Sequence, residues 1–318
     1  MKRATLRHRA EYGLVAIVRS AVRLLPESLS RALGTCIGLA FYVIDGPHRR
    51  LAISQLRAAF PTREPAECRA IARATFAHFG RLLVALLRFS TFTADQMRDR
   101  LEFEGDDRVR AALSAGKGVI IVTGHFGYWE LQGIGHGLGL PPMSVLARPL
   151  DNPLLHEFLE RARCANGNRV IYRQGAIRHV LRALGANETV GFLIDQHIAT
   201  SDAVIVDFFN RPVATTSAVA MMALRTGAAL VPAFALPLAG GRYRLVYETP
   251  VELPPAETAD PVRDLTQRCT DVLEMYVRRH PHLWLWMHRR WRDLGPDSVG
   301  VPGMFPAAAA DEGDPAEP

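Results

Sequence analysis

Short apolar runs alternate with amphipathic helical segments over residues 64–279, and this alternation limits the possible fold more than any other feature of the chain. The first run, residues 119–122, reads Val-Ile-Ile-Val, which is typical of a strand buried on both faces. Similar runs lie at residues 144–147, 170–172, 190–194, 203–206, 229–234 and 243–247, and helical patterns at 64–89, 128–138, 152–164, 176–184, 215–226 and 261–279. Because strands that alternate with helices favour parallel pairing, the sequence predicts an α/β fold, a largely parallel or mixed sheet flanked by helices.

The N-terminal region is strongly basic. Its first 60 residues hold ten Lys or Arg against three Asp or Glu, whereas the net charge of all 318 residues is +6. Apolar stretches interrupt these basic residues, which favours an anionic membrane surface over a nucleic acid. On a helical wheel, an apolar face with Leu14 and Val22 lies opposite Arg19 and Arg23, and the longest uncharged apolar run, residues 32–44, is too short to span a bilayer. We expect helices that lie in the membrane interface, with ordinary packing on the core as the alternative.

The sequence divides into three parts. Residues 1–62 are expected to form the membrane-associating helices, residues 63–297 the α/β domain, and residues 298–318, which lack periodicity, a disordered tail. The four cysteines lie far apart with no CxxC spacing, and no His, Asp or Glu cluster has ligand spacing, so neither a disulfide framework nor a metal site is expected. No signal-peptide cleavage pattern follows a short apolar stretch, so export is not expected.

Catalytic residue types follow the first buried run. Residues 123–130 read Thr-Gly-His-Phe-Gly-Tyr-Trp-Glu, at the strand end where active sites of open α/β sheets lie. On an unbroken helix His125 and Glu130 would point about 140° apart. Gly124 and Gly127 permit a tight turn, which would bring the imidazole and the carboxylate into reach. A carboxylate that holds one ring nitrogen leaves the other as a general base, and a structural histidine is the alternative.

The stretch GKGVIIVTGHFGYWE resembles the His-x4-Asp/Glu block of the lysophospholipid acyltransferase superfamily, specifically of the late (secondary) lipid A acyltransferases. Further similar blocks follow in the family's order, so that the resemblance covers roughly residues 10–293: ARPLDNP, GNRVIYR, FLIDQ, VDFFNRPVATTSA, TGAALVP and WLWMHRRWR. Two positions depart from the family pattern. Tyr128 stands where Asn is usual, and Asn210 stands where Gly is usual.

The resemblance implies an O-acyltransferase at the cytoplasmic face of the cell inner membrane, peripheral or monotopic, with His125 as base and Glu130 as its orienting partner. The implied donor is a fatty acyl thioester on acyl carrier protein or coenzyme A, with no other cofactor, and the implied acceptor is a lipid A precursor. Another glycolipid or lysolipid, such as a phosphatidylinositol mannoside, is the alternative acceptor. No GxSxG motif is present, which favours direct transfer over a serine acyl-enzyme.

Five further residues are candidates for substrate binding. Arg148 and Arg163 are expected to grip phosphate oxygens of the glycolipid, with surface ion pairs as the alternative. Asp195 and Gln196, at a strand end, are expected to orient sugar or phosphate groups, with a strand-end cap as the alternative. Phe209 is expected to line an acyl channel, with plain core as the alternative.

Two other features of the mechanism are left open by the sequence. Backbone N–H groups after His125 are candidate oxyanion donors, because a helix N-terminus carries partial positive charge. A thioesterase in which His125 activates water, or a non-catalytic lipid-binding protein with this fold, remain alternatives of other functional classes.

Overall fold

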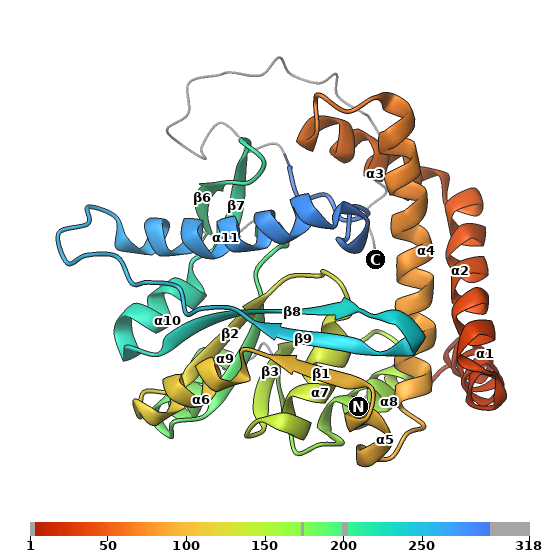
Figure 1. Ribbon diagram of the computed structural model, residues 1–318, viewed down its shortest axis with the longest axis horizontal. Coiled ribbons are helices and arrows are strands. Elements are labelled where there is room, and N and C mark those ends of the chain that lie inside the picture. The colour runs from red at the N-terminus through yellow and green to blue at the C-terminus, as the bar shows by residue number, and fades with distance from the viewer. Residues whose placement is uncertain (1–3, 173–174, 199–202, 293–318) are drawn as a thin grey trace.

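The structure, a computed structural model, describes residues 4–172, 175–198 and 203–292. Within these residues one sheet of seven strands has the order β1-β9-β8-β2-β5-β3-β4 (Figure 1). Neighbouring strands pair in parallel, except that β8 and β9 are antiparallel. The predicted α/β fold with a mixed sheet is therefore confirmed. The strands are β1 (Leu101–Glu104), β2 (Val119–Thr123), β3 (Met143–Ala147), β4 (Arg169–Tyr172), β5 (Thr189–Leu193), β8 (Ala229–Pro237) and β9 (Tyr243–Tyr247).

Helices cover both faces of the sheet, and the central strand β2 shows why its apolar run is continuous. Val119 and Ile121 pack into a cluster with α4 and α7, whereas Ile120 and Val122 pack into a cluster with α9, α10 and α11. Successive side chains of a strand point to opposite faces, so a strand covered on both sides is apolar at every position. The helices are α1 (Leu6–Leu24), α2 (Glu27–Ile44), α3 (Gly46–Ala59), α4 (Pro65–Phe89), α5 (Ala94–Arg98), α6 (Asp106–Ser114), α7 (Trp129–Gly139), α8 (Pro153–Cys164), α9 (Ala176–Gly185), α10 (Ala218–Thr226) and α11 (Pro261–Arg279), with the short 3-10 helices η1 (Ala239–Gly241) and η2 (Pro281–Leu283).

Four elements, β1, β6 (Ala203–Asp207), β7 (Pro212–Thr216) and α10, differ from the prediction. Strand β1 was not predicted because only one of its faces is well buried, so it lacks a continuous apolar run. Strand β6 does not join the main sheet but pairs antiparallel with an unpredicted strand, β7. Because Thr215 and Thr216 complete β7, helix α10 begins three residues later than its pattern indicated.

The N-terminal helices pack closely on the α/β domain. Helix α2 lies along α4, and glycines make the contact possible. A Cβ atom on Gly38 would lie 2.1 Å from the carbonyl oxygen of Phe76, and one on Gly80 would lie 2.0 Å from that of Gly34. Both distances are far below van der Waals contact, so the two backbones approach as closely as only glycine allows.

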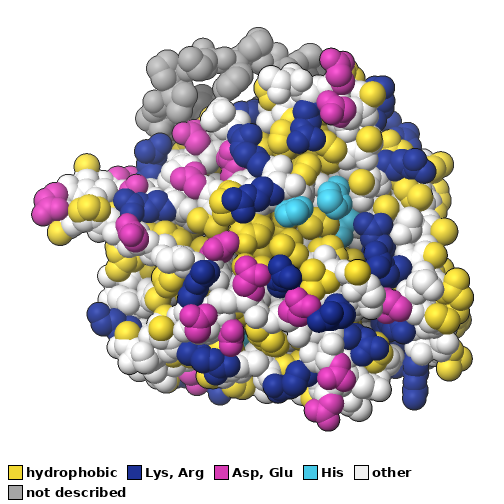
Figure 2. Space-filling view, in the orientation of Figure 1, with side chains coloured by type: hydrophobic (Ala, Val, Ile, Leu, Met, Phe, Trp, Pro, Cys, Tyr) yellow, Lys and Arg dark blue, Asp and Glu magenta, His cyan; other side chains and the backbone are white. Residues whose placement is uncertain are grey.

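Some apolar residues of α1 and α2 pack on the rest of the protein, whereas others are exposed. Val22 is fully buried against α4, as the core-packing alternative expected. Eight large apolar side chains of these helices are nevertheless exposed, among them Leu14 at 64% and Ile17 at 69%, and Figure 2 shows hydrophobic side chains along the edge formed by α1 and α2. Only α4, among the described residues, is long and apolar enough to cross a membrane, and 61% of its apolar window is buried in the protein. The expected tail, residues 298–318, lies outside the described residues.

Candidate active site

A tight turn joins β2 to α7 at the carboxyl edge of the sheet, as the glycine pattern predicted. Gly127 has φ +59°, and a Cβ atom there would lie 2.1 Å from the carbonyl oxygen of Ala235. A Cβ atom on Gly124 would lie 3.0 Å from the Asp195 carboxyl group. The turn thus runs against β8 on one side, where Gly127 needs glycine, and close to Asp195 on the other, where Gly124 leaves room for the carboxyl group, and His125 lies between them.

The carboxylate that holds His125 is Asp195 and not Glu130, which corrects the expected contact. Nδ1 of His125 lies 2.8 Å from Oδ1 of Asp195, and the backbone N–H of His125 donates to Oδ2 over 2.7 Å. Trp284 donates its indole N–H to the same Oδ2 over 2.9 Å. Asp195 is 3% exposed, so it also cannot meet substrate groups as the sequence analysis expected.

Glu130 has a different partner. It lies in the first turn of α7, as predicted, but Nε of Arg163 donates to its Oε2 over 2.9 Å and Nη2 of Arg163 donates to its Oε1. This two-pronged pair is largely buried, with 14% of the Glu130 side chain and 21% of the Arg163 side chain exposed. The carboxylate therefore fixes a guanidinium at the site, because a planar fork matches two carboxylate oxygens.

The electrostatics of the His125–Asp195 pair suit a general base. Burial disfavours the imidazolium, but the charge of Asp195 and the hydrogen bond to it outweigh burial and raise the pKa of His125. Burial disfavours the Asp195 carboxylate too, and His125 and the donated hydrogen bonds outweigh it and lower the pKa of Asp195 to about 2. Asp195 is thus ionised throughout the neutral range. Since Nδ1 is bound to this carboxylate, Nε2 is the nitrogen left for proton transfer.

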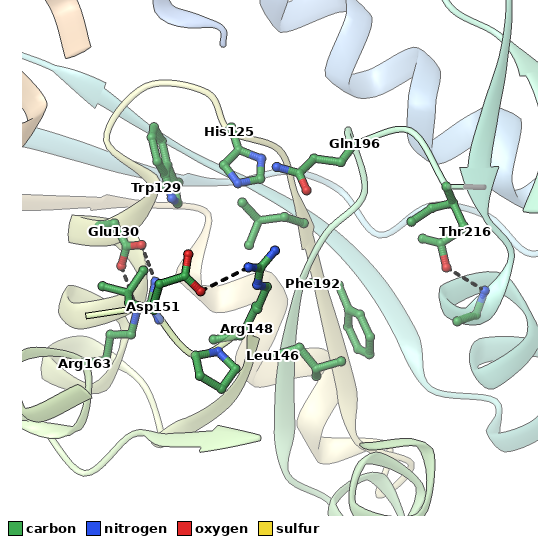
Figure 3. A pocket seen from close by; sticks show the side chains of 16 residues that line it. His125, Trp129, Glu130, Leu146, Arg148, Asp151, Arg163, Phe192, Gln196 and Thr216 are labelled. Atoms are coloured by element: carbon green, nitrogen blue, oxygen red, sulfur yellow. Dashed lines mark hydrogen bonds and ion pairs between the residues drawn. The ribbon is translucent and has the colours of Figure 1, made fainter. Parts of the chain in front are cut away.

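His125 lies on the wall of a cavity of about 640 Å³ at the carboxyl edge of the sheet (Figure 3). One end of the cavity is polar and holds the Glu130–Arg163 pair and Arg148, whose side chain is 78% exposed and lies 3.4 Å from Asp151. The other end is walled by Phe192 and other apolar side chains. Gln196 lies beside His125 with its side-chain amide toward the imidazole. The cavity thus combines an imidazole that is paired with a carboxylate, cationic side chains at one end and apolar walls at the other.

The structure corrects one further expectation and narrows another. Phe209 is 3% exposed and packs with Phe60 and Trp286, so plain core, the open alternative, is correct, and Phe209 is absent from the described residues that line the cavity. The backbone N–H groups of Phe126, Gly127 and Tyr128 each donate to a backbone carbonyl of the protein, so of the N–H groups that follow His125 those in the first turn of α7, residues 129–131, stay the candidate oxyanion donors.

The two departures from the family pattern have physical explanations. The Tyr128 ring is buried against His78 and Tyr243, away from the cavity lining. Asn210 has φ +55°, a left-handed conformation that glycine favours and asparagine tolerates. Among the described residues no group of three or more His, Cys, Asp or Glu is placed to hold a metal ion.

Sequence reasoning missed Trp284 as part of this site. Residues 283–285 pair with the turn that carries His125, although about 160 positions separate them: Gly127 N–H donates to the Leu283 carbonyl over 2.9 Å, and Leu285 N–H to the His125 carbonyl over 3.2 Å. The tryptophan-rich block 284–291 was the available signal, but nothing in its pattern indicates which strand end it meets.

The chain is similar to known bacterial acyltransferases. Residues 1–293 match the family model described as bacterial lipid A biosynthesis acyltransferase. The chain is 27% identical to the lipid A biosynthesis palmitoleoyltransferase of Escherichia coli (strain K12) over 281 residues, which cover 87% of this chain and 90% of that protein. It is 27% identical to the lipid A biosynthesis lauroyltransferase of the same strain over 64% of this chain and 65% of that protein. It is also 26% identical to the phosphatidylinositol mannoside acyltransferase of Mycobacterium tuberculosis (strain ATCC 25618 / H37Rv), over 85% of each chain. The His125–Asp195 pair at the end of β2, on a cavity with one polar and one apolar end, thus lies in a chain that belongs to the bacterial lipid A biosynthesis acyltransferase family.

Proposed function

We propose that the protein transfers a fatty acyl chain from an acyl thioester to a hydroxyl group of a lipid A precursor, with His125 as the general base. The observation that carries the proposal is the His125–Asp195 pair on the wall of the cavity. Asp195 engages Nδ1 of His125 and leaves Nε2 to accept the hydroxyl proton. The thioester is carried by acyl carrier protein or coenzyme A. The names of the relatives support acyl transfer, and the chemistry of the site supports a base-assisted route.

The proposed reaction is a direct transfer. Nε2 of His125 takes the hydroxyl proton as the acceptor oxygen attacks the thioester carbonyl, and the carbonyl π electrons move onto oxygen. The tetrahedral intermediate then expels the thiolate, and the imidazolium returns the proton to sulfur, so that an ester and a free thiol are formed. Asp195 stabilises the imidazolium between these steps, because it is ionised and bonded to Nδ1.

Gln196 is the group we assign to the oxyanion. Its side-chain amide lies beside His125 on the cavity wall, so its N–H₂ can donate where charge develops on the carbonyl oxygen. The backbone N–H groups of residues 126–128 are already engaged, whereas those of residues 129–131, in the first turn of α7, remain candidate donors beside Gln196.

The polar end of the cavity is assigned to the phosphorylated head group of the acceptor. Arg148 is exposed and free to swing from Asp151, and Arg163 is held in place by Glu130. Glu130 is thereby a positioning residue for acceptor binding, and its negative charge also favours the His125 imidazolium. A phosphatidylinositol mannoside is the second candidate acceptor, because a phosphatidylinositol mannoside acyltransferase is similar over 85% of the chain, against 87% for the palmitoleoyltransferase.

We assign the exposed apolar face of α1 and α2 to the cytoplasmic surface of the inner membrane. Leu6, Leu14, Ile17 and Leu24 of α1 are all more than half exposed, and basic side chains flank them. Apolar side chains beside Lys and Arg are the combination that binds an anionic interface. Co-sedimentation with vesicles that contain an anionic phospholipid tests this assignment. A Leu14→Glu, Ile17→Glu double variant that co-sediments as well as the wild type would refute the assignment of this face to the membrane.

Mass spectrometry of membrane lipids from cells with and without the gene tests the function as a whole. The expected result is a lipid A species that gains one acyl chain when the gene is present and loses it in the His125→Ala variant. A gain on a phosphatidylinositol mannoside identifies the second acceptor. Free fatty acid from a thioester, with no change in any lipid, indicates the thioesterase and refutes the transfer.

A further inference from the structure

Residues 283–291, which we call the C-terminal clasp, follow helix α11 and lie across the catalytic turn. The backbone of the clasp pairs with the turn at Phe126 and Trp284. On the other side, the Gln55 side chain of α3 holds the clasp with three hydrogen bonds: its Nε2 donates to the carbonyls of Trp286 (2.6 Å) and His288 (2.8 Å), and its Oε1 accepts from the N–H of Arg290 (3.0 Å). Gln55 is 6% exposed, so the clasp is fixed by buried bonds.

The clasp carries a buried cation whose hydrogen-bond acceptors are neutral. Arg290 is 1% exposed, and its guanidinium donates to the backbone carbonyls of Gln196 and Ala214, each over 2.8 Å, and to Oγ1 of Thr215. Its Nε has no partner, and no carboxylate among the described residues lies within 4 Å of it. Burying an arginine in this way is costly, so a compensating role is expected.

Arg290 acts on the catalytic pair in two ways. Its bond to the Gln196 carbonyl fixes the segment that follows β5, and this segment carries both Asp195 and Gln196. Its charge also interacts favourably with Asp195: burial lowers the pKa of Arg290 to about 10, with Asp195 opposing that shift, and the guanidinium stays charged at neutral pH. Since the pair with a neutral His125 carries a net negative charge, a nearby cation stabilises the form in which the base is ready.

We propose that Trp284 and Arg290 are positioning residues for the base: the clasp fixes the orientation of Asp195 through the indole N–H and biases the His125–Asp195 pair toward neutral His125 through a buried charge. This inference rests on the proposed function, since it gives His125 the role of base. The other charged or titratable groups that face the pair are Glu130 on α7, Arg163 on α8 and His288 on the clasp.

The clasp offers matched controls for both residues. Trp286 is buried like Trp284, but its indole N–H donates to the Pro281 carbonyl over 2.6 Å instead of to Asp195. Trp284→Phe and Trp286→Phe therefore each remove one buried indole bond, and only the first removes it from the catalytic carboxylate. Arg289 is an exposed neighbour of Arg290, so Arg289→Met removes the same charge where solvent screens it.

The test measures the pKa of His125 directly, by NMR of the full-length protein with 13C-labelled histidine, and assigns the signal with His125→Ala. Trp284→Phe and Arg290→Met are expected to raise this pKa by about 0.3 to 1 unit, while Trp286→Phe and Arg289→Met leave it within about 0.1 unit. Arg290→Lys retains the charge and is expected to keep the wild-type pKa while kcat falls, because one ammonium cannot replace the fork. The acid limb of kcat/KM should move with the measured pKa.

The outcomes separate the two proposals. Equal pKa values in Trp284→Phe and Trp286→Phe, or equal shifts in all variants, would overturn the clasp inference. If Arg290→Met fails to fold, the tryptophan pair decides alone. If wild-type protein transfers no acyl chain to any lipid but the pKa values separate as expected, the proposed function fails and the electrostatic role of the clasp stands.

Discussion

Replacement of Asp195 by Asn tests the assignment of the orienting carboxylate. The carboxylate accepts three hydrogen bonds, from Nδ1 and the backbone N–H of His125 and from Trp284. An amide has one acceptor oxygen, so at least one of these donors would face an N–H₂ group. The negative charge that stabilises the imidazolium is also lost. We expect kcat/KM to fall about 10³- to 10⁴-fold, the scale on which loss of the orienting carboxylate acts in a Ser-His-Asp triad, or roughly 4 to 5.5 kcal/mol of barrier.

The pH profile of the same variant gives the direction of the electrostatic effect. In the wild type Asp195 raises the pKa of His125, so the acid limb of kcat/KM lies above the ordinary histidine value of about 6.5. Without the carboxylate, burial and the weaker neighbouring charges set the pKa of His125. The acid limb of the residual kcat/KM should therefore lie at lower pH. Thiol release and lipid product are measured together from about pH 5 to 9.

The control for this experiment is Asp264→Asn, which removes the carboxylate of an i,i+4 surface ion pair on α11 and should change kcat/KM less than about twofold. Circular dichroism and thermal unfolding check that both variants are folded. Activity of Asp195→Asn within tenfold of wild type, or a shift of the acid limb to higher pH, would refute the assignment of Asp195 as the partner of the base.

Three more predictions follow from the site and the helix packing. Glu130→Gln and Arg163→Gln should each lower kcat/KM, and the double variant should be no worse than the poorer single one, because the two side chains act as one unit; fully additive losses in the cycle would contradict this. Gln196→Ala should lower kcat about 10²-fold with little change in KM, since its bond is made in the transition state; an effect on KM alone would make it a binding residue. Gly80→Ala should destabilise the protein by about 1 to 3 kcal/mol in thermal unfolding, because its Cβ would lie 2.0 Å from the Gly34 carbonyl oxygen, and an unchanged Tm would show that α2 and α4 can separate without cost.

The core elements were predictable because their signals are local. The continuous apolar runs of β2 and β5 follow from burial on both faces, and α11 was predicted with the bounds that it has, Pro261–Arg279, because its apolar periodicity is regular and Asp260 and Pro261 mark its start. Strands β1 and β7 are as long as the predicted strands β4 and β2, but they were missed because polar residues interrupt their apolar pattern, Glu102 and Glu104 in β1 and Thr215 and Thr216 in β7.

In the site, too, local features could be predicted from the sequence, whereas contacts between distant residues could not. The glycines around His125 predicted a strand-to-helix turn, since a left-handed φ and a close backbone approach require that residue type. The role of Glu130 was misassigned because sequence proximity suggested a contact, whereas α7 turns its carboxylate toward Arg163 on α8.

The sequence by itself determined the fold class, the position of His125 after a buried strand and the family, because each is encoded in the order of neighbouring residues. Only the tertiary structure decided which carboxylate serves His125 and which residues surround that carboxylate. Asp195 lies 70 positions from His125, and Trp284 lies 89 positions from Asp195, and they meet because parallel pairing of β2 with β5 brings the carboxyl ends of both strands to one edge, over which the clasp folds. No periodicity in a chain encodes a contact that depends on strand order.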